Sequence, residues 1–377
     1  MNSKHSSGSI TYSLSRDSAF RTSQMTLHQR SIWPDWHLDQ WMSENGRDGW
    51  VSVIVPTYNR AGILPAALNS VYEQTYRPIE LIVIDDGSTD DTLDVADAWR
   101  SRHQNGDFEI KLIRQKNAGP SAARNRGLVC STGTYIQFLD SDDRLHPQKL
   151  SVQVRALETH PPCDVIISDN TLFTPCEGGP GFGKLNEDRL LDHADRQAVN
   201  SLSLLNGNLV NGLYRRHLFR HAGPINENLR WMEDVEYNLR VSTLATAVRT
   251  VDVPLLAFSR HDGDHLTGVR NRPEGFDVGF ASVKAMEETV NAVDTDGDAS
   301  IRRTIGNFYM GLAHLALRFD QSENFETAIQ SALRNRTGFL FRLKARVLKA
   351  FRRVAGDDMT YRLWSRIGQF DTTQNEG

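Results

Sequence analysis

Three carboxylates follow a short apolar run in the segment GTYIQFLDSDDRLHPQKL, residues 133–150. The apolar run predicts a buried strand, and the pattern that begins at Pro147 predicts a helix. The acids therefore belong to the turn at the carboxyl end of the strand, where open α/β sheets bind their ligands. Because neighbouring carboxylates repel one another, we expect Asp140 and Asp142 to hold a metal ion or a ligand, and Asp143 to cap the helix.

A second predicted strand also ends in acids. In IVIDDGSTDDT, Asp85 and Asp86 emerge at the same edge of the sheet, and Gly87 permits a tight turn. The first strand ends in PTYN, where Pro56 stiffens the chain and Tyr58 supplies a flat ring. Taken singly, the ring could be packing and the acids a turn. Together they suit a nucleoside diphosphate, with a ring to stack on the base, a carboxylate for its imide N–H, and Mg²⁺ or Mn²⁺ on its phosphates.

Strand and helix patterns alternate around these residues. Such alternation predicts βαβ units and a largely parallel sheet. From about residue 275 onward the signals are helical only. Strands are expected at residues 51–55, 79–85, 109–115, 134–140 and 163–170, with helices at 61–74, 90–101 and 119–131.

Composition narrows the class of protein. The chain has 377 residues and a net charge of −4, and no apolar run approaches the roughly 20 residues that span a bilayer. The three cysteines, Cys130, Cys163 and Cys176, are odd in number and not at zinc spacing, which suits a reducing compartment. Residues 1–31 are rich in Ser and lack the apolar core of a secretory signal, so we expect a flexible extension there.

A basic segment lies near the end of the chain. Residues 334–377 hold ten Lys or Arg and four Asp or Glu, and the stretch 334–354 contains no acid. Apolar residues recur there at helical spacing, which predicts an amphipathic helix. The helix could dock on the rest of the protein, or it could lie on an anionic membrane. Nucleic-acid binding is disfavoured because the remainder of the chain is acidic.

The ordered motifs of the first half carry a resemblance to a known family. The stretch VSVIVPTYNRAGILPAALNSVYEQTYRPIELIVIDDGSTDDT, followed by NAGPSAARNRGL and GTYIQFLDSDD, resembles the family 2 glycosyltransferases with the GT-A fold. The resemblance implies an α/β fold with a mostly parallel, Rossmann-like sheet flanked by helices. It also implies that Tyr58 and Asp86 hold the nucleotide base, that Arg124 points toward the nucleotide, that Asp140 lies near the ribose, and that Asp142 binds the metal.

The segment GPINENLRWMEDVEYNLR resembles the acceptor-side motif of the same family, which implies that Asp234 is the general base. Such a base takes the proton of the acceptor hydroxyl, and it should be neither metal-bound nor buried among apolar groups. Glu233 is the second candidate, and Glu236 better fits an acid that complements the start of a helix. Residues 224–227 read Pro-Ile-Asn-Glu where the family has Gly-Phe-Asp-Glu, so acceptor contacts should differ. Trp231 could face a sugar ring or pack in the core.

A last stretch, FSRHDGDHLTG at residues 258–268, resembles the segment that closes the family's active site. The resemblance implies that Arg260 neutralises the leaving group. It implies that His261 is a further ligand of the metal or the diphosphate, with His265 as the alternative.

These observations predict an inverting glycosyltransferase that needs Mn²⁺ or Mg²⁺. It would move a hexose from a nucleotide sugar, with a UDP-sugar favoured, to a glycan or lipid-linked glycan in exopolysaccharide or other surface glycan assembly. A cytoplasmic location, peripheral at the inner face of the plasma membrane, would follow. Two alternatives are a sugar-nucleotide nucleotidyltransferase, although VPTYNRAG lacks its Gly-rich phosphate loop, and an inactive nucleotide-sugar-binding protein. A dehydrogenase is disfavoured because G-x-G-x-x-G is absent at that turn.

The expected organisation has four parts. A flexible extension at 1–31 precedes a Trp-rich lead-in at 32–49 that packs on the catalytic domain. The GT-A catalytic domain spans 50–270. A helical region at 271–377 follows and contains the basic amphipathic segment 334–354.

Overall fold

The computed structural model describes residues 42, 46–173, 182, 209–259, 272–292, 299–335 and 338–371. Its strands are β1 (Arg47–Thr57), β2 (Ile79–Asp85), β3 (Phe108–Arg114), β4 (Gly133–Phe138), β5 (Arg144–Leu145), β6 (Val165–Phe173), β7 (Gly212–Arg215) and β8 (Val248–Ser259). They form an eight-stranded sheet in the order β3-β2-β1-β4-β7-β6-β8-β5. The first four neighbours in this order run parallel, as the alternation of patterns predicts.

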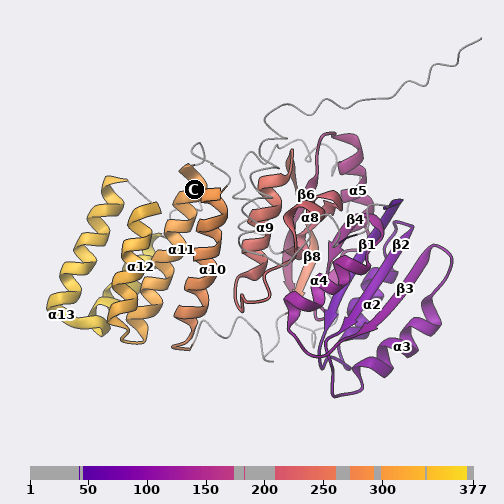
Figure 1. Ribbon diagram of the computed structural model, residues 1–377, viewed down its shortest axis with the longest axis horizontal. Helices are drawn as coiled ribbons and strands as arrows, with labels where there is room; N and C mark the ends of the chain where they lie inside the picture. The colour runs from indigo at the N-terminus through magenta and orange to yellow at the C-terminus, as the bar shows by residue number, and fades with distance from the viewer. Residues whose placement is uncertain are drawn as a thin grey trace, which may run out of the picture.

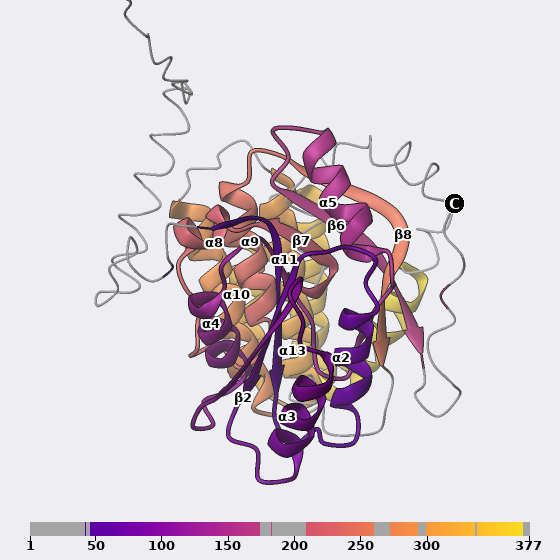
Figure 2. The ribbon, with the colours of Figure 1, turned by 90° about the vertical axis from the view of Figure 1, so that its right-hand side faces the viewer.

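Helices flank the strands of the parallel half. They are α2 (Leu64–Tyr72), α3 (Thr92–His103) and α4 (Pro120–Cys130). In Figure 2, α2 and α4 lie on opposite sides of the strands. Every residue of β2 is buried, as expected for a parallel strand covered on both faces. Helix α4 approaches β1 closely, because a Cβ built on Gly127 would lie 2.3 Å from Cγ2 of Ile54.

The other half of the sheet mixes directions. β7 pairs antiparallel with both β4 and β6, whereas β6 and β8 run parallel. The two-residue strand β5 pairs antiparallel with β8, far along the chain. The expectation that the acidic turn leads directly into a helix was therefore incomplete: β5 intervenes before α5 (Lys149–Thr159) begins. Two residues carry no periodicity, so only the pairing with β8 reveals this strand.

The C-terminal region is helical, as predicted. Its described helices, together with those that precede it, are α8 (His217–Ala222), α9 (Glu233–Leu244), α10 (Gly275–Ala292), α11 (Ala299–Arg318), α12 (Ser322–Asn335) and α13 (Phe339–Asp371). Figure 1 shows α9 between the sheet and α10, with α13 at the far side of the helical region. Gly356 has non-helical torsions and interrupts α13. Among the described residues, no helix combines the length and apolar character needed to cross a membrane.

Two separate cores result. One contains the sheet and the helices that flank it. The other is shared by α10 to α13 and includes Leu239 of α9. Helix α9 therefore contributes to both cores, because Tyr237 and Val241 belong to the sheet core.

The Trp-rich lead-in falls largely outside the described residues, as does the extension at 1–31. In the described part, Met42 is buried in the sheet core. Strand β1 begins at Arg47, three residues before the expected start of the catalytic domain. The Arg47 guanidinium lies 3.3 Å from the ring centroid of Trp50.

Candidate active site

A buried arginine joins the two predicted halves of the site. Arg124 lies on α4, and its guanidinium pairs with Asp140 at 2.8 Å and with Glu233 at 3.2 Å. Asp140 follows β4, whereas Glu233 is the first residue of α9. Burial alone would lower the pKa of Arg124, but Asp140, Glu233 and Asp234 outweigh it and raise that pKa. One cation therefore links the predicted nucleotide side to the predicted acceptor side.

Asp234 lies in the first turn of α9. Its Oδ1 accepts a hydrogen bond of 2.8 Å from the backbone N–H of Val235. Burial raises the pKa of the Asp234 carboxyl to about 6, Glu233 adds to the shift, and Arg124 opposes it. The Asp234 side chain is half-buried, so the expectation that the base is not buried among apolar groups stays a prediction. The raised pKa suits a general base, which works best with a pKa near the operating pH.

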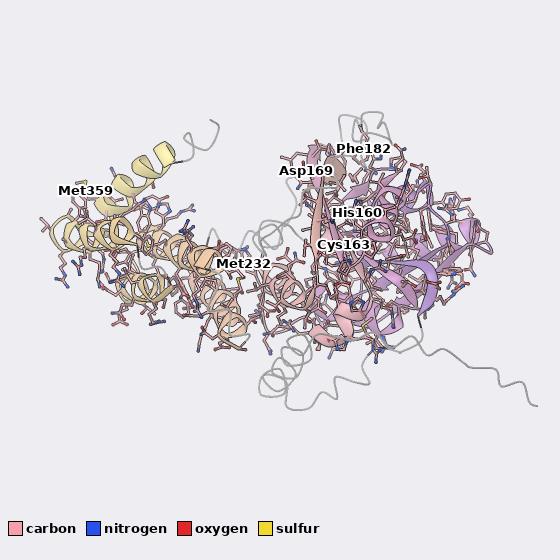
Figure 3. All side chains as sticks on the ribbon, turned by 90° about the horizontal axis from the view of Figure 1, so that it is seen from above. His160, Cys163, Asp169, Phe182, Met232 and Met359 are labelled. Atoms are coloured by element: carbon pink, nitrogen blue, oxygen red, sulfur yellow. The ribbon has the colours of Figure 1, made fainter. Side chains whose placement is uncertain are left out.

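The residue before this turn has an unusual backbone. Met232 has a φ of 60° and adopts the left-handed region at the N-cap of α9. Strained backbone of this kind persists only where the surrounding structure enforces it, and it is often found at functional sites. Figure 3 shows Met232 between the sheet and the helical region. The conformation sets the direction in which Glu233 and Asp234 begin the helix.

The other two acids of the turn after β4 differ in surroundings. Asp142 is half-buried. Asp143 is buried, and its Oδ1 accepts a hydrogen bond of 2.9 Å from the backbone N–H of Ser259 in β8. Burial raises the pKa of Asp143 to about 9, and Asp140 adds to the shift. The prediction that Asp143 caps a helix was wrong, because it instead ties the turn to β8.

Asp86 has a positioning role that the sequence did not suggest. Its Oδ1 accepts hydrogen bonds from Gln115 Nε2 at 2.8 Å and from the Ala118 backbone N–H at 2.9 Å. Its Oδ2 accepts one from the Gly119 N–H at 2.8 Å. A carboxylate has about four lone-pair sites, so these three hydrogen bonds leave one acceptor site on Asp86. Asp86 thus fixes the start of α4, the helix that carries Arg124.

The predicted stacking residue is accessible. Tyr58 follows β1 and is 44% exposed, which leaves its ring available to a ligand. Pro56 is buried within β1. The neighbouring Asn59 has a φ of 51°, and its Oδ1 accepts a hydrogen bond of 2.8 Å from the Thr89 N–H. The turns after β1 and β2 are therefore held together beside Tyr58.

Asn125 was missed by the sequence reasoning. Its Nδ2 donates to the Ile225 carbonyl at 2.9 Å and to Glu227 at 2.8 Å, and its Oδ1 accepts from the Ile225 N–H at 2.7 Å. It therefore fastens the acceptor-side loop to α4. The only signal was its place directly after Arg124 in NAGPSAARNRGL, and nothing in that motif names the partner loop.

Trp231 packs against the helical region. A Cβ built on Gly279 of α10 would lie 2.7 Å from the Trp231 ring, and Ser282 donates a hydrogen bond to the Trp231 carbonyl. The ring is half-buried against the helical core. This packing accounts for the residue, and a contact with a sugar ring stays a prediction.

Only some of the residues predicted to bind the metal belong to the described part of the chain. Arg260, His261 and His265 lie outside them. In the described ranges, no group of three or more His, Cys, Asp or Glu is placed to hold a metal ion. Asp142 remains as a half-buried oxygen donor, with Asp140 engaged by Arg124. One or two carboxylates fit Mg²⁺ or Mn²⁺ bound mainly through substrate phosphates, and they do not fit a metal cage made by protein alone.

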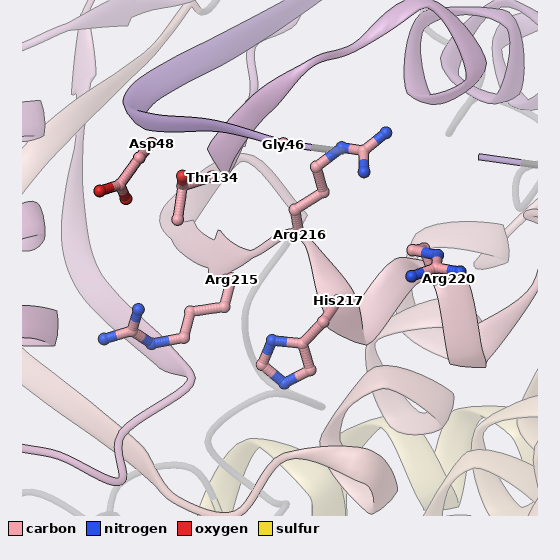
Figure 4. Close-up of a pocket in the computed structure, with 7 residues that line it drawn as sticks. All are labelled: Gly46, Asp48, Thr134, Arg215, Arg216, His217 and Arg220. Carbon is pink, nitrogen blue, oxygen red and sulfur yellow. The ribbon is translucent and has the colours of Figure 1, made fainter. Parts of the chain in front are cut away.

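A separate cavity of about 300 Å³ opens at the start of β1 and β4 and includes Arg215 and Arg216. Arg215 and Arg216 both stabilise the fold. Arg215 donates to the carbonyls of Cys163 and Leu157, and Arg216 donates to that of Ser131. Figure 4 shows the guanidinium groups of Arg215 and Arg216 pointing in opposite directions. They do not converge on one ligand, so the candidate site remains the one around Arg124.

Comparison with known proteins identifies the family and the fold. The family model "Glycosyl transferase family 2" matches residues 52–221. A "PGL/p-HBAD biosynthesis glycosyltransferase" of Mycobacterium tuberculosis is 33% identical over 217 residues, which cover 56% of this chain and 77% of that protein. An "Uncharacterized glycosyltransferase" of Rickettsia felis is 41% identical over 111 residues, 29% of this chain and 18% of that protein. The crystal structure of S. aureus TarS 1-349 in complex with UDP-GlcNAc superposes with a TM-score of 0.62 at 22% identity, covering 83% of this chain and 89% of that chain.

Proposed function

Because the chain belongs to glycosyl transferase family 2 and is a glycosyltransferase with the GT-A fold, we propose that it transfers a hexose from a nucleotide sugar with inversion at the anomeric carbon. The observation that carries this proposal is the contact of Arg124 with both Asp140 and Glu233. This contact joins the carboxyl end of β4 to the start of α9, which bears Asp234. A donor and an acceptor could thus be held on either side of one buried cation.

We assign the donor side to residues at the carboxyl ends of β1, β2 and β4. Tyr58 would stack on the base, Asp86 would accept its imide N–H, and Asp140 would lie near the ribose. A uridine nucleotide is the favoured donor, which the UDP-GlcNAc complex of the similarly folded TarS structure supports. Asp142 would hold Mn²⁺ or Mg²⁺, with His261 as a further ligand. When bound, the cation would neutralise charge on the leaving diphosphate.

On the acceptor side, Asp234 takes the proton of the acceptor hydroxyl as that oxygen attacks the anomeric carbon. The bond between that carbon and the diphosphate oxygen breaks, and its electron pair leaves with the diphosphate. Arg124 restrains the rise in the Asp234 pKa, which keeps the carboxylate ionised at neutral pH. Arg260 would add positive charge near the leaving group. The acceptor we propose is a glycan or lipid-linked glycan of surface polysaccharide assembly, at the cytoplasmic face of the plasma membrane.

Asp234→Asn tests the assignment, because it preserves size and removes basicity. Donor binding should stay near that of the parent, while turnover falls by roughly 10²–10⁴, the usual contribution of a general base. Calorimetry with UDP and Mn²⁺ and an assay of transfer from a UDP-hexose measure the two quantities. Asp97→Asn on the exposed face of α3 is the matched control. Turnover within a few-fold of the parent would move the base elsewhere, with Glu233→Gln the next variant.

A further inference from the structure

One face of α13 leaves apolar side chains in solvent. Leu343, Val347 and Val354 are 45%, 55% and 89% exposed, and Ala350 is exposed as well. The spacings of four, three and four residues place all of them on a single row of the helix. Within the described residues, seven large apolar side chains are exposed, and three of them belong to this row. Such clustering differs from the scattered apolar residues of an ordinary surface.

The opposite face of the same helix is docked. Phe341, Ala345 and Leu348 are buried in the core shared with α11 and α12. Docking therefore accounts for one half of the helix and leaves the exposed row unexplained. The sequence presents docking on the protein and binding to a membrane as alternatives for this helix. In the structure the two interactions can use opposite faces of α13.

Arginines line the exposed row. Arg342, Arg346 and Arg353 are exposed and lie on the neighbouring row of the helix. In the part of the chain that the structure describes, none of the three forms an ion pair, whereas Lys349 and Arg352 both pair with Glu326 of α12. The basic residues nearer the core thus have a structural task, and the outer three do not share it.

We propose that this outer face of α13, formed by the row Leu343, Val347, Ala350 and Val354 with its flanking arginines, docks on an anionic membrane surface. A lipid interface offers an apolar layer for the aliphatic row and phosphates for the arginines. A soluble polyanion would leave the aliphatic row in water. A second copy packed antiparallel by a two-fold axis perpendicular to the helix would oppose arginine to arginine. The inference goes beyond the proposed reaction, since vesicle binding is measured without donor or acceptor.

Helix α13 lies on the side of the helical region away from the catalytic domain. Figure 1 shows α13 at the far side of the helical region, and Figure 3 shows Met359 of the same helix at the end of the molecule opposite the sheet. The described elements leave Leu343, Val347 and Val354 exposed on this helix. A flat surface can therefore reach the row without moving the sheet.

Co-sedimentation of the full-length protein with vesicles tests the inference. Binding is expected to vesicles that contain phosphatidylglycerol and not to vesicles of phosphatidylcholine alone, and added salt should weaken it. The charge reversals R346E and R353E, made together, should lower the partition coefficient at least about tenfold. The pair L343Q and V347Q should lower it several-fold, because it removes apolar groups from the interface.

Two matched controls separate this face from the rest of the surface. Leu172→Gln alters an aliphatic residue of β6 that is 58% exposed, and Arg303→Glu reverses an exposed charge on α11. Both should bind vesicles like the parent, and all variants should keep the parent melting temperature. Equal binding to neutral vesicles would overturn the proposal, as would indifference to R346E and R353E. A concentration-dependent dimer that these substitutions dissociate would assign the face to self-association instead.

Discussion

The proposed chemistry depends on a few charged side chains that are buried or half-buried around Arg124. The Arg124 guanidinium forms ion pairs with both Asp140 and Glu233, and the two pairs fix its orientation. Charge-assisted hydrogen bonds of this kind are stronger than neutral ones, and breaking a buried pair is costly. Asp234 lies close enough to feel Arg124, yet its pKa remains raised. Arg124 therefore lowers the pKa of Asp234 relative to the effect of burial alone, while Glu233 raises it further.

At this scale, Asp142→Ala should abolish metal-dependent nucleotide binding. The substitution removes the carboxylate expected to hold the cation, and the diphosphate loses its neutralising partner. Calorimetry with UDP, with and without Mn²⁺, measures the effect. Asp358→Ala, an exposed acid of α13, is the control and should bind like the parent. Unchanged affinity in the Asp142 variant would remove that residue from the site.

The pKa of Asp234 also predicts a pH profile. Below about pH 6 the carboxyl is protonated and cannot accept a proton. The logarithm of kcat/KM should therefore fall as pH drops through about 6, by roughly tenfold per unit at the limit. A carboxyl with a raised folded-state pKa favours folding on protonation, so this group does not cause acid unfolding in that range. Circular dichroism checks that the fold persists, and a flat profile between pH 5 and 7 would contradict the assignment.

Helix α9 carries the proposed base and also packs in both hydrophobic cores. Its first turn carries Glu233 and Asp234, its middle packs in the sheet core through Tyr237, and Leu239 enters the helical core. The helix start is further held by Trp231 against α10. Moving α10 should therefore displace the turn that carries the proposed base, even though α10 contributes no predicted catalytic residue.

Gly279→Val tests this coupling. A Cβ at this position would lie 2.7 Å from both Leu312 and the Trp231 ring, so the contact must open. Overpacking of this kind usually costs about 1–3 kcal/mol. We expect lower thermal stability and a fall in kcat with little change in donor affinity. Gly311→Val, where a Cβ meets nothing within 4 Å, controls for the loss of a helical glycine. Parent turnover in the Gly279 variant would show that α10 does not position the base.

Over the whole molecule, the two cores divide the work. The sheet core supports the strands whose ends carry the residues proposed to bind the donor, and the helical core supports α9 from the other side. Helix α13 completes the helical core with one face and presents an apolar, basic surface with the other. Deleting residues 334–377 would therefore remove buried side chains together with the surface, and point variants separate these effects better.

Adjacent residues of α13 provide such a pair. Leu348 is 4% exposed and Val347 is 55% exposed. Leu348→Ala should lower the free energy of unfolding by about 2–5 kcal/mol, the range for truncating a buried leucine. Val347→Ala should change it by less than about 0.5 kcal/mol. Urea denaturation followed by circular dichroism measures both, and equal effects would mean that α13 is not docked as described.

The sequence by itself determined the parallel half of the sheet and the edge of that sheet at which the proposed donor-binding residues lie. Local patterns suffice there, because each βα unit brings the end of its strand to one edge, and Tyr58, Asp86, Asp140 and Asp142 all follow strands. The helical spacing of apolar residues likewise predicted the helical C-terminal region. Only long-range contacts of the tertiary structure decided the rest. Arg124 pairs with Glu233, Asn125 binds the loop at residues 225–227, and Asp143 binds β8. Each of these contacts joins segments about 100 residues apart in the sequence. No local sequence pattern encodes such pairs. The raised pKa of Asp234 and the exposed row on α13 also depend on tertiary packing, because packing determines which face of each element is buried.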